Sequence, residues 1–363
     1  MNYNCYRMKI KGRHNVIFFI LLLVLLCVGY SFNPPAHLDL IRYYEMVEDQ
    51  GSSSSSEVAE YFHLIKFDFV YFYLLAYFKH TFLGMTFLTG LINMVFYYLV
   101  LKDADSLLLK YSKYYFVLMF GLFCFPNFIW VLELSRTALA VIFFFIGVLI
   151  WMRWNKFYSL AFFALAMITH TTSIMFSLLF ILSYYSYVFF FYKKDRLINI
   201  LSVILPFIML VVLSIAFKAV INNPLLAILV GDSAYQGYLG GISADANGFA
   251  YAEYGTVAIM IAEMVSVYLL LNVSKQNSLE RFLLLIFGSV TIGFCYASGN
   301  FYKRFALCFT LFYAMYFVYL YKNEILGRTK NRTKILRTMS FNSYICIFSF
   351  LLEFYAYRFW TLI

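Results

Sequence analysis

The chain has 363 residues, of which 63% are hydrophobic, 22% aromatic and only 13% charged, and its formal net charge is +10 at pH 7. Soluble globular domains carry about 25% charged residues, so this composition excludes an ordinary soluble enzyme. The mean hydropathy is +0.78, and several apolar runs approach the roughly 20 residues that a helix needs to cross a bilayer. The sequence therefore predicts an all-α, polytopic integral membrane protein whose single domain covers residues 1–363.

The positive charge is explained by membrane topology rather than by a nucleic-acid partner. Lysine and arginine lie mainly in short segments between the apolar runs, which is typical of cytoplasmic loops. The six cysteines are scattered, without the spacing of a disulfide framework or a zinc site. We therefore expect no nucleic-acid partner, no metal and no cofactor.

The N-terminal segment resembles a signal peptide but has no convincing cleavage site. Basic residues between Arg7 and Arg13 precede an apolar run at 16–28, and a Pro-Pro pair ends the first predicted helix, 15–32. We interpret it as an uncleaved anchor with its N-terminus in the cytoplasm. The acidic segment that follows, 33–66, is then predicted to be an outer loop.

The remaining apolar runs alternate across the membrane. Residues 67–78 are short for a crossing, so this segment either extends backward to Tyr61 or forms a re-entrant or interfacial element, and the charges favour the second. Residues 81–101 form a full span that ends inside. The pattern predicts about eleven crossings, with ten or twelve as alternatives. The later spans are expected at 114–131, 136–152, 157–169, 172–192, 197–217, 255–272, 281–297, 302–321 and 343–362.

Two further loops follow from this topology. Residues 218–253 form an outer loop rich in glycine, aspartate and tyrosine. Residues 322–341 form a basic cytoplasmic loop, whose charges are explained by topology or by contact with anionic lipid.

Two polar residues interrupt neighbouring spans on either side of a basic turn. Arg136 opens one span and His170 follows the next, while Arg153 and Lys156 mark the inside turn between them. If both segments cross the bilayer, Arg136 and His170 lie at the same, outer, membrane face. Lys303 and Arg304, at the head of a later span, are placed at that face too.

Each of these side chains has a functional and a structural interpretation. A guanidinium fork at Arg136 or Arg304 matches the oxygens of a phosphate, with Lys303 assisting, but an arginine also anchors helix ends by snorkelling. His170 has the chemistry of a general base, or of an interfacial histidine bonded to the threonines beside it.

Further candidates lie in the two outer loops. The carboxylate of Asp39 is a second candidate base, and Tyr43 beside it offers a ring on which a sugar can stack. Tyr235, Tyr238 and Asp245 combine aromatic faces and a carboxylate in a glycine-rich segment, which suits sugar binding or simply a loop at the membrane interface.

The order of these features resembles the EpsG-like and Wzy-type polysaccharide polymerases of bacterial envelopes. The matching pieces are Asp39–Tyr43, Arg136–Ala140, Lys156–Tyr158, Ala166–Ile174 and the late Arg304. The block from Arg136 to His170 is the most specific part, and the similarity extends over most of the chain.

The resemblance implies a metal-independent glycosyl transfer at the outer face of the bacterial inner membrane. An oligosaccharide on undecaprenyl diphosphate would be transferred to another lipid-linked repeat unit, extending O-antigen or a related surface polysaccharide. Arg136, Arg304 and Lys303 would bind diphosphate, and His170 or Asp39 would act as base. The implied partners are the lipid-linked oligosaccharide, membrane lipid and a chain-length regulator.

Three alternatives remain open on the sequence, one of which is a purely structural or sensory membrane protein. A lipid-linked glycan flippase or transporter would place charges at mid-depth in several helices, and Glu263 is the only strong example. An O-antigen ligase would use the same donor with a lipid A-core acceptor.

Overall fold

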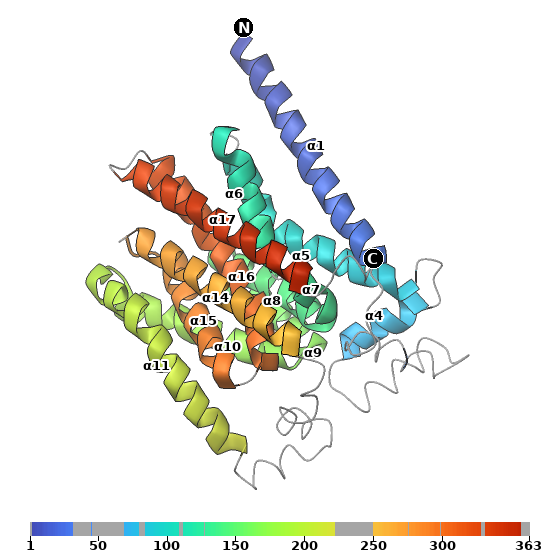
Figure 1. Ribbon diagram of the computed structural model, residues 1–363, viewed down its shortest axis with the longest axis vertical. Helices are drawn as coiled ribbons and strands as arrows, with labels where there is room; N and C mark the ends of the chain where they lie inside the picture. Colours follow the sequence, from blue (N-terminus) through green and yellow to red (C-terminus); the bar gives the residue numbers. More distant parts are fainter. Residues whose placement is uncertain are drawn as a thin grey trace.

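The computed structural model is all-helical throughout the residues that it describes, which are 2–31, 45, 69–79, 84–108, 112–126, 128–221, 250–274, 276–297, 299–327 and 331–356. Within these ranges, six helices are long and apolar enough to cross a membrane, and four shorter apolar segments accompany them. The predicted fold class, a polytopic helical membrane protein, is confirmed. Figure 1 shows the helices as one bundle, with α1 along one side.

The first two long helices run in opposite directions, and the described helix between them is short. Helices α1 (Asn2–Ser31) and α5 (Gly84–Leu108) run antiparallel, because Phe18 packs on Tyr98 and Gly29 packs directly on Gly90. The end of α1 therefore lies beside the start of α5 (Figure 1). The helix between them, α4 (Phe69–Lys79), has 11 residues, or about 16 Å, against a bilayer core of roughly 30 Å.

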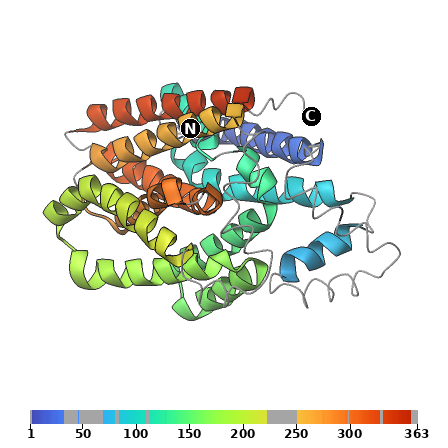
Figure 2. The ribbon, with the colours of Figure 1, turned by 60° about the horizontal axis from the view of Figure 1, so that its bottom comes forward.

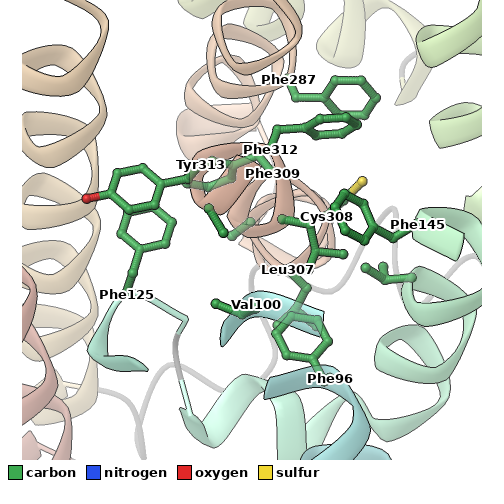
Figure 3. Packing of buried hydrophobic residues seen from close by; sticks show 14 of the residues in the cluster. Phe96, Val100, Phe125, Phe145, Phe287, Leu307, Cys308, Phe309, Phe312 and Tyr313 are labelled. Carbon is green, nitrogen blue, oxygen red and sulfur yellow. The ribbon is translucent and has the colours of Figure 1, made fainter. Parts of the chain in front are cut away.

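The predicted continuous span at 114–131 is wrong, because the helix breaks at a proline. Helix α6 (Ser112–Cys124) ends before Pro126, and a short helix α7 (Phe128–Glu133) follows. Proline has no backbone N–H and clashes with the preceding helical turn. The hydroxyl of Tyr97 donates to the Pro126 carbonyl at 3.4 Å. The Phe125 ring stacks on Tyr313 with centroids 3.6 Å apart (Figure 3), so the break packs against the middle of α16.

Helices α8 (Ser135–Arg153) and α9 (Lys156–Thr169) form a tight antiparallel hairpin. The Asn155 side chain caps α9 by accepting from the Phe157 N–H at 2.8 Å, which is a favoured way to satisfy a helix N-terminus. Gly147 lets α8 approach α9, because a methyl group there would meet the Phe163 ring at 2.7 Å. Arg153 pairs with Asp103 at 2.9 Å, so α5 and α8 end at the same side of the bundle.

The second half of the chain is also helical in the residues that the structure describes. Its elements are α10 (Thr172–Ser186), a π-helical turn η1 (Tyr187–Phe191), α11 (Asp195–Ile221), α14 (Ala250–Val273), α15 (Leu279–Ala297), α16 (Gly299–Leu320), a second π-helical turn η2 (Tyr321–Ile325) and α17 (Arg332–Ala356). Helices α14 and α17 lie side by side (Figure 2). The segment predicted as a basic loop, 322–341, is helical from Arg332 onward, so the last span begins earlier than expected.

A buried arginine joins several helices at the end of the bundle where Arg153 lies. Arg281, only 1% exposed, donates to the carbonyl of Leu271 at 3.0 Å and to the side-chain oxygen of Asn199 at 2.7 Å. A third, longer bond reaches the Gln276 carbonyl at 3.5 Å. These acceptors belong to α11, the end of α14 and the loop before α15. The guanidinium therefore ties three helices together without a carboxylate partner among these contacts.

Candidate functional site

Arg136 and His170 lie at the same end of the α8–α9 hairpin. Arg136 is in the first turn of α8 and is 7% exposed, while His170 directly follows α9 and is 3% exposed. The hairpin turn at Trp154 and Asn155 is at the opposite end. The juxtaposition that the sequence indicated is therefore present, although the two residues are 34 positions apart.

Two side-chain contacts join the head of α16 to α7, the short helix just before this end of the hairpin. The ammonium group of Lys303 lies 3.4 Å from both carboxylate oxygens of Glu133. The rings of Trp130 and Tyr302 meet edge to face with centroids 5.5 Å apart. Because Glu133 precedes α8 by only two residues, Lys303 and Arg304 are brought to the end of the bundle that holds Arg136.

A contact from α10 completes the cluster. The Phe176 ring, in the second turn of α10, packs edge to face on Phe305 with centroids 4.9 Å apart. His170 precedes α10 by two residues, and Arg304 precedes Phe305 directly. We call Arg136, His170, Lys303, Arg304 and Glu133 the head cluster, since each lies at or beside the end of a helix.

The short helix α4 covers part of the head cluster. The guanidinium carbon of Arg136 lies 5.6 Å from the centre of the Phe72 ring, in a cation–π arrangement. The hydroxyls of Tyr71 and Ser135 are 2.6 Å apart. Since Tyr71 and Phe72 are fully buried while Tyr73 and Tyr77 are exposed, α4 presents one face to the cluster and the other outward.

The imidazole of His170 is held close to a hydroxyl group. Its Nε2 lies 3.4 Å from the Thr172 Oγ1, and its backbone N–H donates to the Ala166 carbonyl at 2.9 Å. A hydroxyl next to a ring nitrogen can accept or donate, depending on which nitrogen carries the proton. The ring is therefore oriented by the turn between α9 and α10.

A carboxylate deeper in the bundle supports the head of α16. The Tyr302 hydroxyl donates to the Glu263 carboxylate at 2.9 Å, and both residues are buried. One turn further along α14, Ser266 bonds to Asn342, whose amide also donates to the Tyr313 hydroxyl at 2.7 Å. Glu263 is thus hydrogen-bonded to a neighbouring helix inside the bundle.

The head cluster carries more positive than negative charge, and its two arginines are buried. It contains two arginines and a lysine against the single carboxylate of Glu133. Buried cations interact with an anion more strongly than exposed ones do, because water screens them less. Among the residues that the structure describes, no group of three or more His, Cys, Asp and Glu side chains is arranged to hold a metal ion.

Part of the predicted site lies outside the described residues. This applies to the candidate base in the first outer loop and to all four candidate sugar-binding residues, namely Asp39, Tyr43, Tyr235, Tyr238 and Asp245. The two predicted outer loops, 33–66 and 218–253, lie almost entirely outside them as well.

Sequence reasoning missed several residues that build the head cluster. They include Glu133, Trp130 and the Tyr71–Phe72 pair of α4. Glu133 had a local signal, since it is three positions before Arg136. No local signal could have joined α4 to Arg136, because Phe72 and Arg136 are 64 positions apart in the sequence.

Comparison with known proteins identifies the family. Neither the curated proteins nor the solved structures gave a significant match. The EpsG family model matches residues 16–361, nearly the whole chain. The chain is therefore a multi-pass membrane protein that belongs to the EpsG family, a membership that indicates a polysaccharide polymerase-like role.

Proposed function

We propose that this protein polymerises polyprenyl-diphosphate-linked oligosaccharide repeat units by glycosyl transfer at the outer face of the bacterial inner membrane. The observation that carries the proposal is the head cluster, which gathers two buried arginines, a lysine and a histidine at one end of an apolar bundle. A donor with a lipid tail and a diphosphate needs both features. The product would be O-antigen or a related surface polysaccharide.

The arginines have the properties that the leaving diphosphate requires. When the glycosidic bond to the diphosphate breaks, negative charge accumulates on the phosphate oxygens. Arg136 and Arg304 would stabilise that charge through paired N–H donors, assisted by Lys303. Such stabilisation needs no metal ion, and we therefore propose a metal-independent reaction.

The acceptor hydroxyl needs a base, for which His170 is the best-supported candidate. Its imidazole lies at the same end as Arg136 and is oriented by Thr172. Asp39 remains the alternative base, and Tyr43, Tyr235, Tyr238 and Asp245 remain the proposed sugar contacts. All five lie in outer loops on the proposed topology, which places the N-terminus in the cytoplasm. We also propose a chain-length regulator as a partner protein.

The decisive test replaces Arg136 in a strain that lacks the native gene. With Arg136→Ala we expect elongation to fall by about 10²–10³-fold, as for loss of a charge-stabilising donor in other enzymes, leaving lipid-linked single repeat units. Glycan length is read by gel electrophoresis, and membrane insertion by immunoblot. The matched control is Arg196→Ala, an exposed arginine at the start of α11, which should leave chain length unchanged.

The deletion strain separates the proposal from its alternatives. Single-unit glycan in that strain supports a polymerase, whereas full-length polymer that is not joined to lipid A-core would indicate a ligase. Normal long-chain glycan in the Arg136→Ala strain would overturn the diphosphate-binding role.

A further inference from the structure

A cavity lies at the end of the bundle opposite the head cluster. It has a volume of about 440 Å³ and is enclosed mainly by α5, α8 and α16, which is within the roughly 300–1,000 Å³ typical of small-molecule sites. The salt bridge between Arg153 and Asp103 forms part of its rim. No part of the proposed polymerase chemistry uses this cavity.

The rim of the cavity is charged and predominantly positive. Its cations are Lys102, Arg153 and Lys322, and its carboxylates are Asp103 and Glu280. Arg153 is paired with Asp103 at 2.9 Å, whereas Lys322 is exposed and Lys102 lies over the Tyr98 ring at 5.2 Å. The two lysines are therefore the cations that a bound anion would meet first.

The walls of the cavity are apolar and extend deep into the bundle. From the rim the lining reaches Phe145, eight residues from Arg153, and Leu311, eleven residues from Lys322. At 1.5 Å per helical residue these separations correspond to a depth of about 12–16 Å. Figure 3 shows Phe145 and Val100, two of the wall residues, in the packed core beside α16.

A charged rim above a deep apolar pocket fits an amphipathic anion. We propose that this cavity binds an anionic phospholipid from the leaflet at this end of the protein. The phosphate would lie between Lys102 and Lys322, with Arg153 beside it, and one acyl chain would enter between α5, α8 and α16. Basic pockets between spanning helices on the cytoplasmic side are known to bind such headgroups. A soluble phosphate compound would leave the apolar walls unfilled.

The test measures lipid binding to the purified full-length protein in detergent. Phosphatidylglycerol should raise its melting temperature in a saturable way, because a ligand that binds only the folded state stabilises it, and phosphatidylcholine should not. The variant Lys102→Gln/Lys322→Gln should weaken the apparent affinity by about fivefold for each lysine removed. Lys193→Gln/Lys194→Gln, which removes the same charge from exposed positions outside the cavity, should retain it.

Two further measurements test the acyl-chain part. Val318→Phe places a larger side chain in the apolar wall and should also weaken phosphatidylglycerol binding. With the native protein, glycerol 3-phosphate and inorganic phosphate should give no comparable stabilisation. Equal stabilisation by either would assign the cavity to a soluble phosphate and overturn the proposal, as would unchanged affinity in the lysine variant. Because this comparison uses the native chain, it holds even if a variant does not fold.

Discussion

The two ends of the bundle use buried arginine in different ways. At one end, Arg281 donates to two backbone carbonyls and to the Asn199 side chain, joining the ends of neighbouring helices. At the other end, Arg136 faces the Phe72 ring of a helix too short to cross the bilayer. Burial alone therefore does not distinguish a structural arginine from a candidate functional one. The chemical type of the surrounding groups is more informative.

The largest expected effect tests the structural arginine. Arg281→Ala removes three hydrogen bonds from a charged donor, one of them buried and two partly buried, so we expect the free energy of unfolding to fall by about 3 kcal/mol. The measurement is the melting temperature of the purified protein, with Arg136→Ala measured in parallel.

The contrast predicts opposite phenotypes. Arg281→Ala should reduce the amount of folded protein but not the glycan made per folded molecule. Arg136→Ala should reduce the glycan made per folded molecule but not the amount of folded protein. If both variants lose stability to the same extent and neither loses specific activity, the distinction between the two ends fails.

A smaller effect is expected at the ion pair of the head cluster. Lys303→Gln should lower elongation by about tenfold, because it removes a charged donor from the diphosphate. Glu133→Gln breaks the same ion pair but keeps the cation, so it should change elongation by much less. The rates are compared from the glycan length distribution at equal protein levels. Equal losses in the two variants would assign the pair a purely structural role.

The smallest effect is expected where the head cluster meets the bundle interior. Tyr302→Phe removes the hydroxyl that donates to Glu263, which should cost about 1 kcal/mol of stability. Elongation should fall only to the extent that Lys303 and Arg304 lose their position. Tyr73→Phe, at an exposed tyrosine of α4, is the control. A melting temperature unaffected by Tyr302→Phe would show that Glu263 does not depend on this bond.

The overall architecture was predictable because it depends on local patterns. Apolar run length predicted the spans, and the basic turn at Arg153 predicted that Arg136 and His170 lie at one end of a hairpin. The same pattern failed at Pro126, where the apolar run continues but the helix does not. Hydropathy responds to side chains, whereas a proline break depends on a missing backbone donor.

The contacts that assemble the candidate site could not be predicted in this way. Lys303 and Glu133 are 170 residues apart, Tyr302 and Glu263 are 39 apart, and Arg281 and Asn199 are 82 apart. Each depends on which faces of non-adjacent helices meet, and the apolar sequence around them leaves many pairings equally hydrophobic. The family match was predictable from a few polar residues at helix ends, which the apolar sequence does not obscure.

The contact between Gly29 and Gly90 has a consequence for how the protein is made. A side chain on either glycine would overlap the other helix, so α1 and α5 fit together only as bare backbone surfaces, a common way for membrane helices to associate. Sixty residues separate these two glycines in the chain. Because α1 is synthesised before α5, it must remain in the bilayer with this surface uncovered until the ribosome has delivered its partner.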